Sequence, residues 1–265
     1  MAINCIHPNA KLGANVVVEN FTTIAEHVEI GEGSWIGSNV TICDYVKLGR
    51  NCKVFPGAVV GGIPQDLKFR GEISYVEVGD NVTIRECVTI NRGTAASGKA
   101  LTKIGDNCLI MAYVHVAHDC KIANNVVLVS AVGLAGETDI DEYAIIGGHS
   151  GVHQFTRVGA HVMLSGGSMV SKDVPPYVLA GHRPLVYGGL NVVGLRRRGF
   201  TNEQVDLIRD IYRIVYQSAL ITAEACDKIE AAFPPSVERD TILHFIRSSK
   251  RGIIRAKTLG EQIDE

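Results

Sequence analysis

Polar and titratable residues in the middle of the chain recur at intervals of 18 positions. His118 is followed 18 residues later by Gly136 and, after 18 more, by Gln154, while Asp119 and Glu137 occupy the adjacent positions of the same series. A neutral imidazole near pH 7 is suited to take a proton from a hydroxyl group. A neighbouring carboxylate would orient the ring, and a glycine would offer an unobstructed backbone N–H to a developing oxyanion. One hypothesis is therefore general-base catalysis by His118.

Two other interpretations of these histidines are open on the residues alone. Zinc is commonly bound by neutral imidazoles, and His115, His118 and His153 could surround one ion. That arrangement is found in the γ-class carbonic anhydrases, so a metal-dependent hydratase is the second hypothesis. In the third hypothesis the histidines are ordinary surface residues of a scaffold without catalytic activity.

A six-residue repeat indicates the elements that must position these side chains. Ile, Leu or Val returns at every sixth position from Ile6 to Val60, from Val78 to Ile90 and from Ile104 to Val170. Gly often follows the aliphatic residue, and we expect it to supply backbone angles needed at a corner. The pattern is the signature of a hexapeptide parallel β-helix, in which each hexad is a short strand and a turn. Known hexapeptide proteins wind three hexads per coil into a left-handed prism, which would place residues 18 apart over one another.

Composition excludes several other classes of protein. The formal net charge of −2 provides no basic surface for nucleic acid, and no apolar run reaches the roughly 18 residues of a membrane span. The seven cysteines include no C-x-x-C pair, and the N-terminus lacks the layout of a signal peptide. We therefore expect free thiols and a cytoplasmic location. Cys52, Cys108 and Cys120 fall on small inward positions and are expected to fill the core.

The repeat is interrupted twice and ends before the chain does. Residues 61–77 and 91–103 do not fit the frame, and we expect two loops that project from the prism and reach a neighbouring subunit. Beyond the β-helix of residues 1–187, residues 188–265 are predicted to form a Gly-rich connector and a small α-helical domain. The first helix follows the capping box Thr201–Gln204, a second covers 223–233, and a third runs from Ser236 to Ile246.

The segment His115-Val116-Ala117-His118-Asp119-Cys120 resembles the active-site segment of the UDP-N-acetylglucosamine O-acyltransferases, the first enzymes of lipid A biosynthesis. The resemblance covers nearly the whole chain. Its other motifs are Gln65-Asp66-Leu67-Lys68, Arg92-Gly93-Thr94, Val152-His153-Gln154-Phe155, Asp173-Val174-Pro175-Pro176-Tyr177-Val178 and Arg197-Arg198-Gly199-Phe200.

This resemblance implies transfer of an R-3-hydroxyacyl chain from acyl carrier protein to the glucosamine 3-hydroxyl of UDP-N-acetylglucosamine, with no metal or cofactor. It implies that His118 is the base, Asp119 its orienting carboxylate and Gly136 the oxyanion N–H donor. It also implies a homotrimer with sites between subunits. The residues implied to contact the substrates are Gln65, Asp66, Lys68, His115, Glu137, His153, Gln154, Asn191, Arg197 and Arg198.

The chain departs from the family pattern at two positions. Members often carry His where this chain has Asn91 and Glu137, which leaves the role of Glu137 open. Met163 and Gly166 fall where the family sets acyl length, and the small Gly166 indicates room for a long chain. The later N-acyltransferase of the same pathway has an additional N-terminal domain, for which hexads beginning at Ile6 leave no room.

Overall fold

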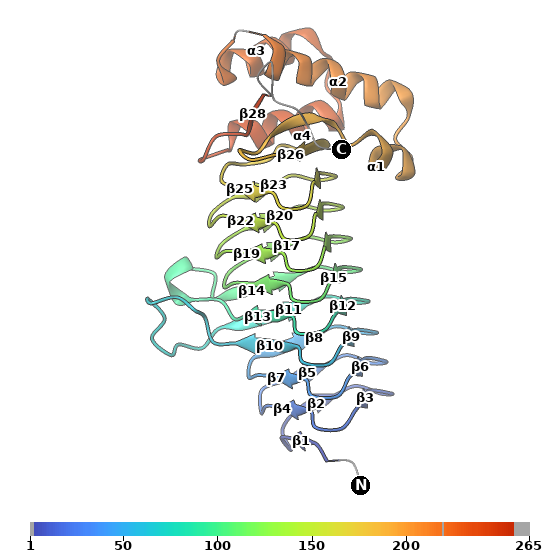
Figure 1. Cartoon of the computed structure of the whole chain (residues 1–265), viewed down its shortest axis with the longest axis vertical. Helices are drawn as coiled ribbons and strands as arrows, with labels where there is room; N and C mark the ends of the chain where they lie inside the picture. The colour runs from blue at the N-terminus through green and yellow to red at the C-terminus, as the bar shows by residue number, and fades with distance from the viewer. Residues whose placement is uncertain (1–2, 219, 257–265) are drawn as a thin grey trace.

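Each hexad forms a short strand and a turn, and the strands stack into three sheets that make the sides of a prism (Figure 1). The computed structural model describes residues 3–218 and 220–256. Sheet A contains β1 (Cys5–Ile6), β4 (Thr23–Ile24), β7 (Thr41–Ile42), β10 (Val59–Gly62), β13 (Thr89–Asn91), β16 (His115–Val116), β19 (Gly133–Leu134), β22 (Gly151–Val152) and β25 (Met169–Val170).

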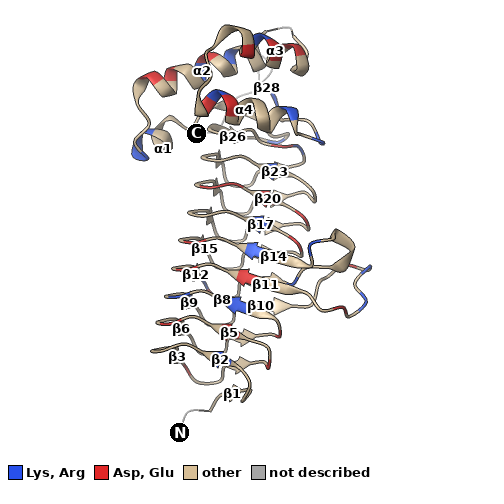
Figure 2. Cartoon of the chain, turned by 180° about the vertical axis from the view of Figure 1, so that it is seen from behind, with Lys and Arg blue, Asp and Glu red and all other residues tan. Residues whose placement is uncertain are grey.

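Sheet B is built in the same way from the hexads that follow. It contains β2 (Lys11–Leu12), β5 (Glu29–Ile30), β8 (Val46–Leu48), β11 (Tyr75–Val78), β14 (Leu101–Ile104), β17 (Lys121–Ile122), β20 (Asp139–Ile140) and β23 (Arg157–Val158). Figure 2 shows basic and acidic residues alternating along its outer face at β8, β11 and β14. This face is therefore polar and charged.

Sheet C completes the prism and extends into the C-terminal part. It contains β3 (Val17–Val18), β6 (Trp35–Ile36), β9 (Lys53–Val54), β12 (Thr83–Ile84), β15 (Leu109–Ile110), β18 (Val127–Leu128), β21 (Ile145–Ile146), β24 (Met163–Leu164), β26 (Val178–Gly181), β27 (Val186–Leu190) and β28 (Arg255–Ala256). The β26–β27 pair is antiparallel. The pairs between coils are parallel throughout the described prism.

The register confirms that one coil contains three hexads. His115 of β16 pairs with Gly133 of β19, and Val116 pairs with Leu134, an offset of 18 residues. The same offset relates Lys121 of β17 to its partner in β20. Residues 18 apart therefore lie over one another, as the columns in the sequence require.

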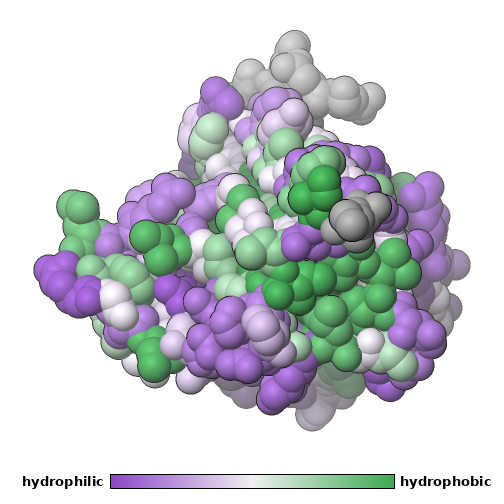
Figure 3. All heavy atoms as spheres, turned by 90° about the horizontal axis from the view of Figure 1, so that it is seen from below, coloured by the Kyte–Doolittle hydropathy of each residue, from purple (hydrophilic) through white to green (hydrophobic). Residues whose placement is uncertain are grey.

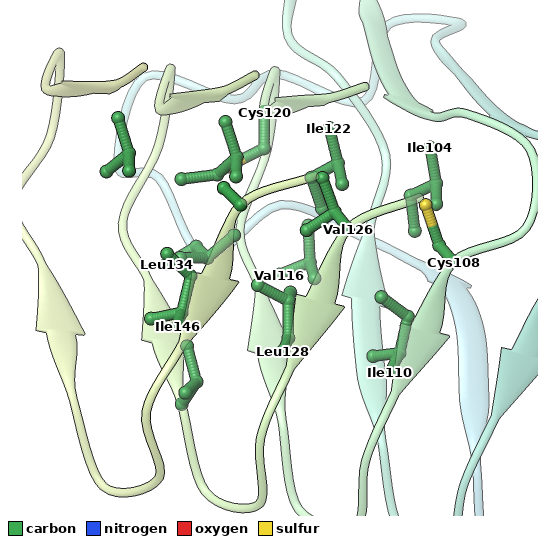
Figure 4. Packing of buried hydrophobic residues seen from close by; sticks show 14 of the residues in the cluster. Ile104, Cys108, Ile110, Val116, Cys120, Ile122, Val126, Leu128, Leu134 and Ile146 are labelled. Carbon is green, nitrogen blue, oxygen red and sulfur yellow. The ribbon is translucent and has the colours of Figure 1, made fainter. Parts of the chain in front are cut away.

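The aliphatic position of each hexad points into a continuous core (Figure 4). Cys120 lies in this core, and burial raises the pKa of its thiol to about 12, which keeps it protonated. The first coil differs, because Ile6 and Leu12 are 37% and 38% exposed. Among the described residues, no coil packs below them, and Figure 3 shows an apolar patch at this end of the prism.

The glycines that follow the aliphatic residues have a different role from the one expected. Apart from Gly61 (φ 87°), they do not have positive φ angles; those corner positions are occupied by residues such as Asn51 (φ 54°) and Asn81 (φ 58°). A Cβ on Gly31 would lie 2.5 Å from the backbone of Gly49, and a Cβ on Gly49 would lie 2.4 Å from the carbonyl oxygen of Gly79. Close stacking of successive coils, rather than an unusual backbone angle, therefore requires glycine here.

The C-terminal part packs on the last coils as a group of helices (Figure 1). They are α1 (Val192–Arg197), α2 (Asn202–Gln217), α3 (Thr222–Ala232) and α4 (Val237–Arg247). The Thr201–Gln204 capping box is confirmed, whereas the predicted connector contains β27 and α1. None of the described helices is long and apolar enough to cross a membrane. The boundary at 187/188 stays a prediction, and residues 1–2, 219 and 257–265 of the predicted domains lie outside the described residues.

An aromatic stack joins this helical part to the prism. His161 is 9% exposed and stacks on Tyr143 and Tyr177, with ring centroids 5.0 and 5.6 Å away, while Phe200 meets it edge-on. Burial and, secondarily, the charge of Arg198 lower the pKa of His161 to about 4. The ring is therefore neutral in the folded protein at neutral pH.

This lowered pKa predicts a loss of stability in acid. An unfolded histidine titrates near pH 6.5, so the stabilisation is fully present above that pH and is lost as pH falls toward about 4. The loss attributable to His161 is up to roughly 3 kcal/mol at about 1.4 kcal/mol per pKa unit. His161→Phe keeps an aromatic ring in the stack and removes the titration. Urea unfolding between pH 7 and pH 4 should show a weaker pH dependence for this variant; an unchanged dependence would contradict this account of His161.

Candidate active site

The turns that lead from sheet A to sheet B lie over one another and form one edge of the prism, the A–B corner. Residues 63–74, between β10 and β11, and residues 92–100, between β13 and β14, are insertions at this corner. They are shorter than the predicted loops 61–77 and 91–103. The last three residues of each predicted loop belong instead to strands of sheet B, β11 and β14, which pair with each other. The turn of the next coil, between β16 and β17, carries His118. Figure 1 shows both insertions projecting on the same side of the prism.

His118 is 8% exposed, and each nitrogen of its ring faces a carboxylate. Nδ1 lies 2.9 Å from Oδ2 of Asp119, and Nε2 lies 3.7 Å from Oδ2 of Asp66. An ionised carboxylate only accepts hydrogen bonds, so Nδ1–H donates to Asp119, and in the neutral imidazole Nε2 then carries the lone pair. The distance from Nε2 to Asp66 is too long for a hydrogen bond. A substrate hydroxyl that reached Nε2 would therefore lie beside Asp66.

Asp119 is fully buried, and the second insertion supplies donors to its carboxylate. The backbone N–H of Thr94 donates to it at 3.0 Å, and the hydroxyls of Thr94 and Ser97 both donate at 2.7 Å. Burial alone would raise the pKa of Asp119, but the hydrogen bonds from Ser97, His118 and Thr94 outweigh burial and lower it. The carboxylate is thus held ionised against Nδ1 of the imidazole.

Gly136 lies directly against the other side of the His118 ring. A Cβ at this position would be 2.4 Å from Nε2 and 2.5 Å from Cε1 of that ring. The backbone N–H groups of Ala135 and Glu137 donate to Val152 and His118, whereas the Gly136 N–H has no partner among residues 3–218 and 220–256. An oxyanion donor must have an unpaired N–H near the reacting group, and the Gly136 N–H beside His118 meets this requirement.

A groove of about 590 Å³ runs from His118 along the outer face of sheet A. Two glycines of this face, Gly133 of β19 and Gly151 of β22, pair with each other, so no side chain covers the outer face of the sheet there. Met169 of β25 pairs with Gly151 on the next strand. The groove walls are mostly apolar. The predicted site residues that line it are Gln65, His115, His118, Gly136 and His153.

The first insertion places Asp66 by a local hydrogen bond. Oδ1 of Asp66 accepts the backbone N–H of Lys68 at 2.9 Å, which leaves Oδ2 toward His118. The side chain of Lys68 is exposed, and neither Lys68, Glu137 nor Gln154 lines the groove. The insertion therefore brings Gln65 and Asp66, rather than the lysine, to the histidine within one chain.

The three histidines do not converge on one point as a zinc site would require. Nδ1 of His115 lies 2.7 Å from the hydroxyl of Thr89, and Nδ1 of His153 lies 3.0 Å from the carbonyl oxygen of Gln154. Burial lowers the pKa of His115, which favours its neutral form. The part of the chain that the structure describes contains no group of three His, Cys, Asp or Glu side chains arranged to hold an ion. The geometry therefore favours the first hypothesis.

Comparison with known proteins agrees with this geometry. Residues 173–254 match the family model described as domain 2 of UDP N-acetylglucosamine O-acyltransferase, and residues 27–62 and 101–136 match the bacterial transferase hexapeptide model. The acyl-[acyl-carrier-protein]–UDP-N-acetylglucosamine O-acyltransferase of Thermodesulfovibrio yellowstonii is 43% identical over 251 residues, 94% of this chain and 96% of the relative. The chain belongs to the UDP-N-acetylglucosamine O-acyltransferase family.

Solved structures of UDP-N-acetylglucosamine acyltransferases superpose on nearly the whole chain. The protein from Bacteroides fragilis is 49% identical with a TM-score of 0.93, and the match covers 96% of this chain and 99% of that one. The protein from Francisella novicida is 37% identical with a TM-score of 0.93 over 100% and 99% of the two chains. The family assignment thus includes the C-terminal part as well as the prism.

Several residues predicted to bind substrates in this family lie elsewhere in the chain. Asn191 donates its amide to the carbonyl oxygen of His161 and accepts the N–H of Gly194, so it caps α1. Arg197 is exposed, and Arg198 lies over the ring of Tyr143 at 5.2 Å. His161 and Tyr143 belong to the corner between sheets B and C, not to the A–B corner. One chain therefore does not bring these residues to His118.

The two residues predicted to set acyl length also lie outside the groove. Met163 is in β24 of sheet C, and Gly166 is on the turn that follows it. Their role in acyl length stays a prediction. Within a single chain, the apolar end of the groove is formed instead by Met169 and Val170.

Sequence reasoning missed the donors that hold Asp119. Thr94 and Ser97 lie in an insertion without periodicity, and the hydroxyl of Thr102 accepts the Asp119 N–H at 2.8 Å. The available signal was the position of the insertion in the frame. Because it replaces the A–B turn one coil before His118, it had to lie against Asp119.

Gly136→Ala tests the contact between Gly136 and the ring. We expect the variant to fold, because φ at Gly136 is not positive, but its Cβ would displace the His118 ring. A misplacement of about 1 Å at a catalytic group costs on the order of 100-fold in rate. Acyl-transfer rates and a crystal structure of the variant provide the measurement.

Gly133→Ala is the structural control, since a Cβ at Gly133 meets nothing within 4 Å. In that variant the His118 ring should keep its position. A Gly136→Ala enzyme with the ring unmoved and the rate undiminished would contradict the proposed contact.

Proposed function

We propose that this chain transfers an R-3-hydroxyacyl chain from acyl carrier protein to the glucosamine 3-hydroxyl of UDP-N-acetylglucosamine, the first step of lipid A biosynthesis. The observation that carries the proposal is the setting of His118, which lines an apolar groove, with Asp119 on Nδ1 and Asp66 3.7 Å from Nε2. The 43% identical relative is named for this acceptor and this carrier. Direct transfer requires a base and an oxyanion site, and His118 and the Gly136 N–H beside the groove are suited to these roles.

In the proposed reaction His118 Nε2 removes the proton of the sugar 3-hydroxyl. The hydroxyl oxygen attacks the thioester carbonyl carbon, and the carbonyl oxygen becomes an oxyanion stabilised by the Gly136 N–H. When the carbon–sulfur bond breaks, His118 returns its proton to the departing thiolate of the carrier. The products are the sugar ester and the free thiol of acyl carrier protein. Asp119 orients the His118 ring, and its negative charge stabilises the imidazolium that forms when His118 takes the proton.

The remaining residues have proposed roles in binding. Gln65, His115 and His153 line the groove with His118, Asp66 faces Nε2 at 3.7 Å, and we propose that these four residues contact the sugar. The proposed contacts to the rest of the two substrates are made by Lys68, Glu137, Gln154, Asn191, Arg197 and Arg198. Arginine suits the diphosphate because its guanidinium makes paired hydrogen bonds to phosphate. Met163 and Gly166 would limit the acyl chain.

The separation of these residues supports a proposed assembly with sites between subunits. Asn191, Arg197 and Arg198 lie away from the A–B corner, so their proposed role in binding would require a second copy that brings its own B–C corner to the groove. Leu67, which is 94% exposed at the tip of the first insertion, is suited to contact that copy. We propose a trimer of left-handed β-helices with sites between subunits, located in the cytoplasm where both substrates are expected.

His118→Ala tests the proposed base. The variant should fold normally, because the side chain lies on a turn outside the aliphatic core, and it should lose acyl transfer by at least about 100-fold. The rate is measured with R-3-hydroxyacyl carrier protein and UDP-N-acetylglucosamine, with mass detection of the product.

His244→Ala is the matched control, since His244 is exposed on α4 and does not line the groove. It should retain wild-type turnover. Near wild-type turnover by His118→Ala would refute the role of His118, and absence of product with the wild-type enzyme would refute the proposed substrates.

A further inference from the structure

The two insertions are joined to each other at Glu72. Oε1 of Glu72 accepts the backbone N–H of Ala95 at 3.0 Å, and Oε2 accepts the backbone N–H of Arg70 at 2.7 Å. Hydrogen bonds from the N–H groups of Arg70, Glu72 itself and Ala95 lower the pKa of this carboxyl group. An ionised carboxylate on the first insertion thus holds the beginning of a turn, Ala95–Ser97, on the second.

This contact differs from the other connections between the insertions. At their bases, Asn91 donates to the carbonyl oxygen of Ile63 at 3.0 Å, and β10 pairs with β13. Nearer the tips, a single hydrogen bond joins residues 64–73 to residues 94–100 in the described part of the chain. It is the bond from the Ala95 N–H to Glu72. Glu72 is therefore the polar link that sets the outer parts of the two insertions relative to each other.

Each insertion reaches one end of the His118 ring. Ala95 directly follows Thr94, whose N–H and hydroxyl hold Asp119 on Nδ1. On the other insertion, Asp66 faces Nε2 at 3.7 Å. A path of contacts therefore runs from Asp66 along the first insertion to Glu72, across to Ala95 and Thr94, and back through Asp119 to the same imidazole.

We propose that Glu72 is a positioning residue for acyl transfer, which keeps Asp66 and Asp119 correctly placed on opposite ends of His118 by joining the two insertions. Glu72 does not touch the groove and acts through Ala95 and Thr94. The inference deepens the proposed function and rests on it for its catalytic consequence. The joining of the insertions, however, is testable without any substrate.

Hydrogen exchange of the substrate-free protein tests the link itself. In Glu72→Ala the Ala95 N–H loses its acceptor, and exchange in residues 94–97 should become roughly tenfold faster, the effect of losing one hydrogen bond. The core amide of Ile122 should be unaffected. Glu77→Ala is the matched control, because Glu77 lies five positions later on the exposed face of β11, where its carboxylate is 3.9 Å from Nζ of Lys103. Unchanged exchange in residues 94–97 of Glu72→Ala would overturn the proposal.

Steady-state kinetics tests the consequence for catalysis. Glu72→Ala should lower kcat roughly tenfold with little change in KM for either substrate, because the groove is intact while the base is less well held. Glu72→Gln keeps one carbonyl oxygen for the Ala95 N–H and should recover most of kcat, a rescue that a general loss of folded enzyme would not produce. Glu77→Ala should match the wild type.

The two proposals fail in different ways. If the wild-type enzyme transfers the acyl chain and Glu72→Ala has the same kcat, the role of Glu72 is wrong and the proposed function stands. If the wild-type enzyme makes no product, the proposed function fails and the catalytic role of Glu72 fails with it, whatever the exchange rates show.

Discussion

The Asp119 carboxylate is completely buried, and a buried charge must be compensated by donors in its immediate surroundings. Most backbone groups of the prism are paired with neighbouring coils, so donors from outside the regular hexads compensate this charge. The second insertion supplies the Thr94 N–H and two hydroxyls, and His118 supplies the remaining donor. The orientation of the imidazole, the conformation of the insertion and the ionisation of Asp119 therefore depend on one another.

The regularity of the fold explains how distant segments meet at this carboxylate. A coil of three hexads returns each turn to the same corner, so insertions in consecutive coils must stack beside the next turn. Both insertions and the His118 turn occupy the A–B corner, and Gly136 follows one coil later. The missing side chain of Gly136 then leaves room for the imidazole ring. The regular hexads form the scaffold, and the two insertions and Gly136 shape the surroundings of His118.

The six-residue frame predicted the core and the 18-residue coil because both follow from periodicity. The exposure of Ile6 and Leu12 was not predicted, since the period marks every aliphatic position as inward and does not distinguish the first coil from the others. Column spacing also predicted that Gly136 would lie by His118. Thr94, Ser97 and Glu72 could not be placed, because the path of an aperiodic insertion depends on tertiary contacts. Asn191, Arg197 and Arg198 required the family resemblance, and within this chain they lie near the corner between sheets B and C, away from His118.

In the proposed reaction, His118 is held at Nδ1 so that Nε2 meets the acceptor hydroxyl. A crystal structure of the assembled protein with UDP-N-acetylglucosamine tests it most directly. The account predicts the sugar 3-hydroxyl within hydrogen-bonding distance of His118 Nε2 and beside Asp66, with Asp119 still accepting from Nδ1. A 3-hydroxyl that lies against another group, beyond the reach of Nε2, would contradict it.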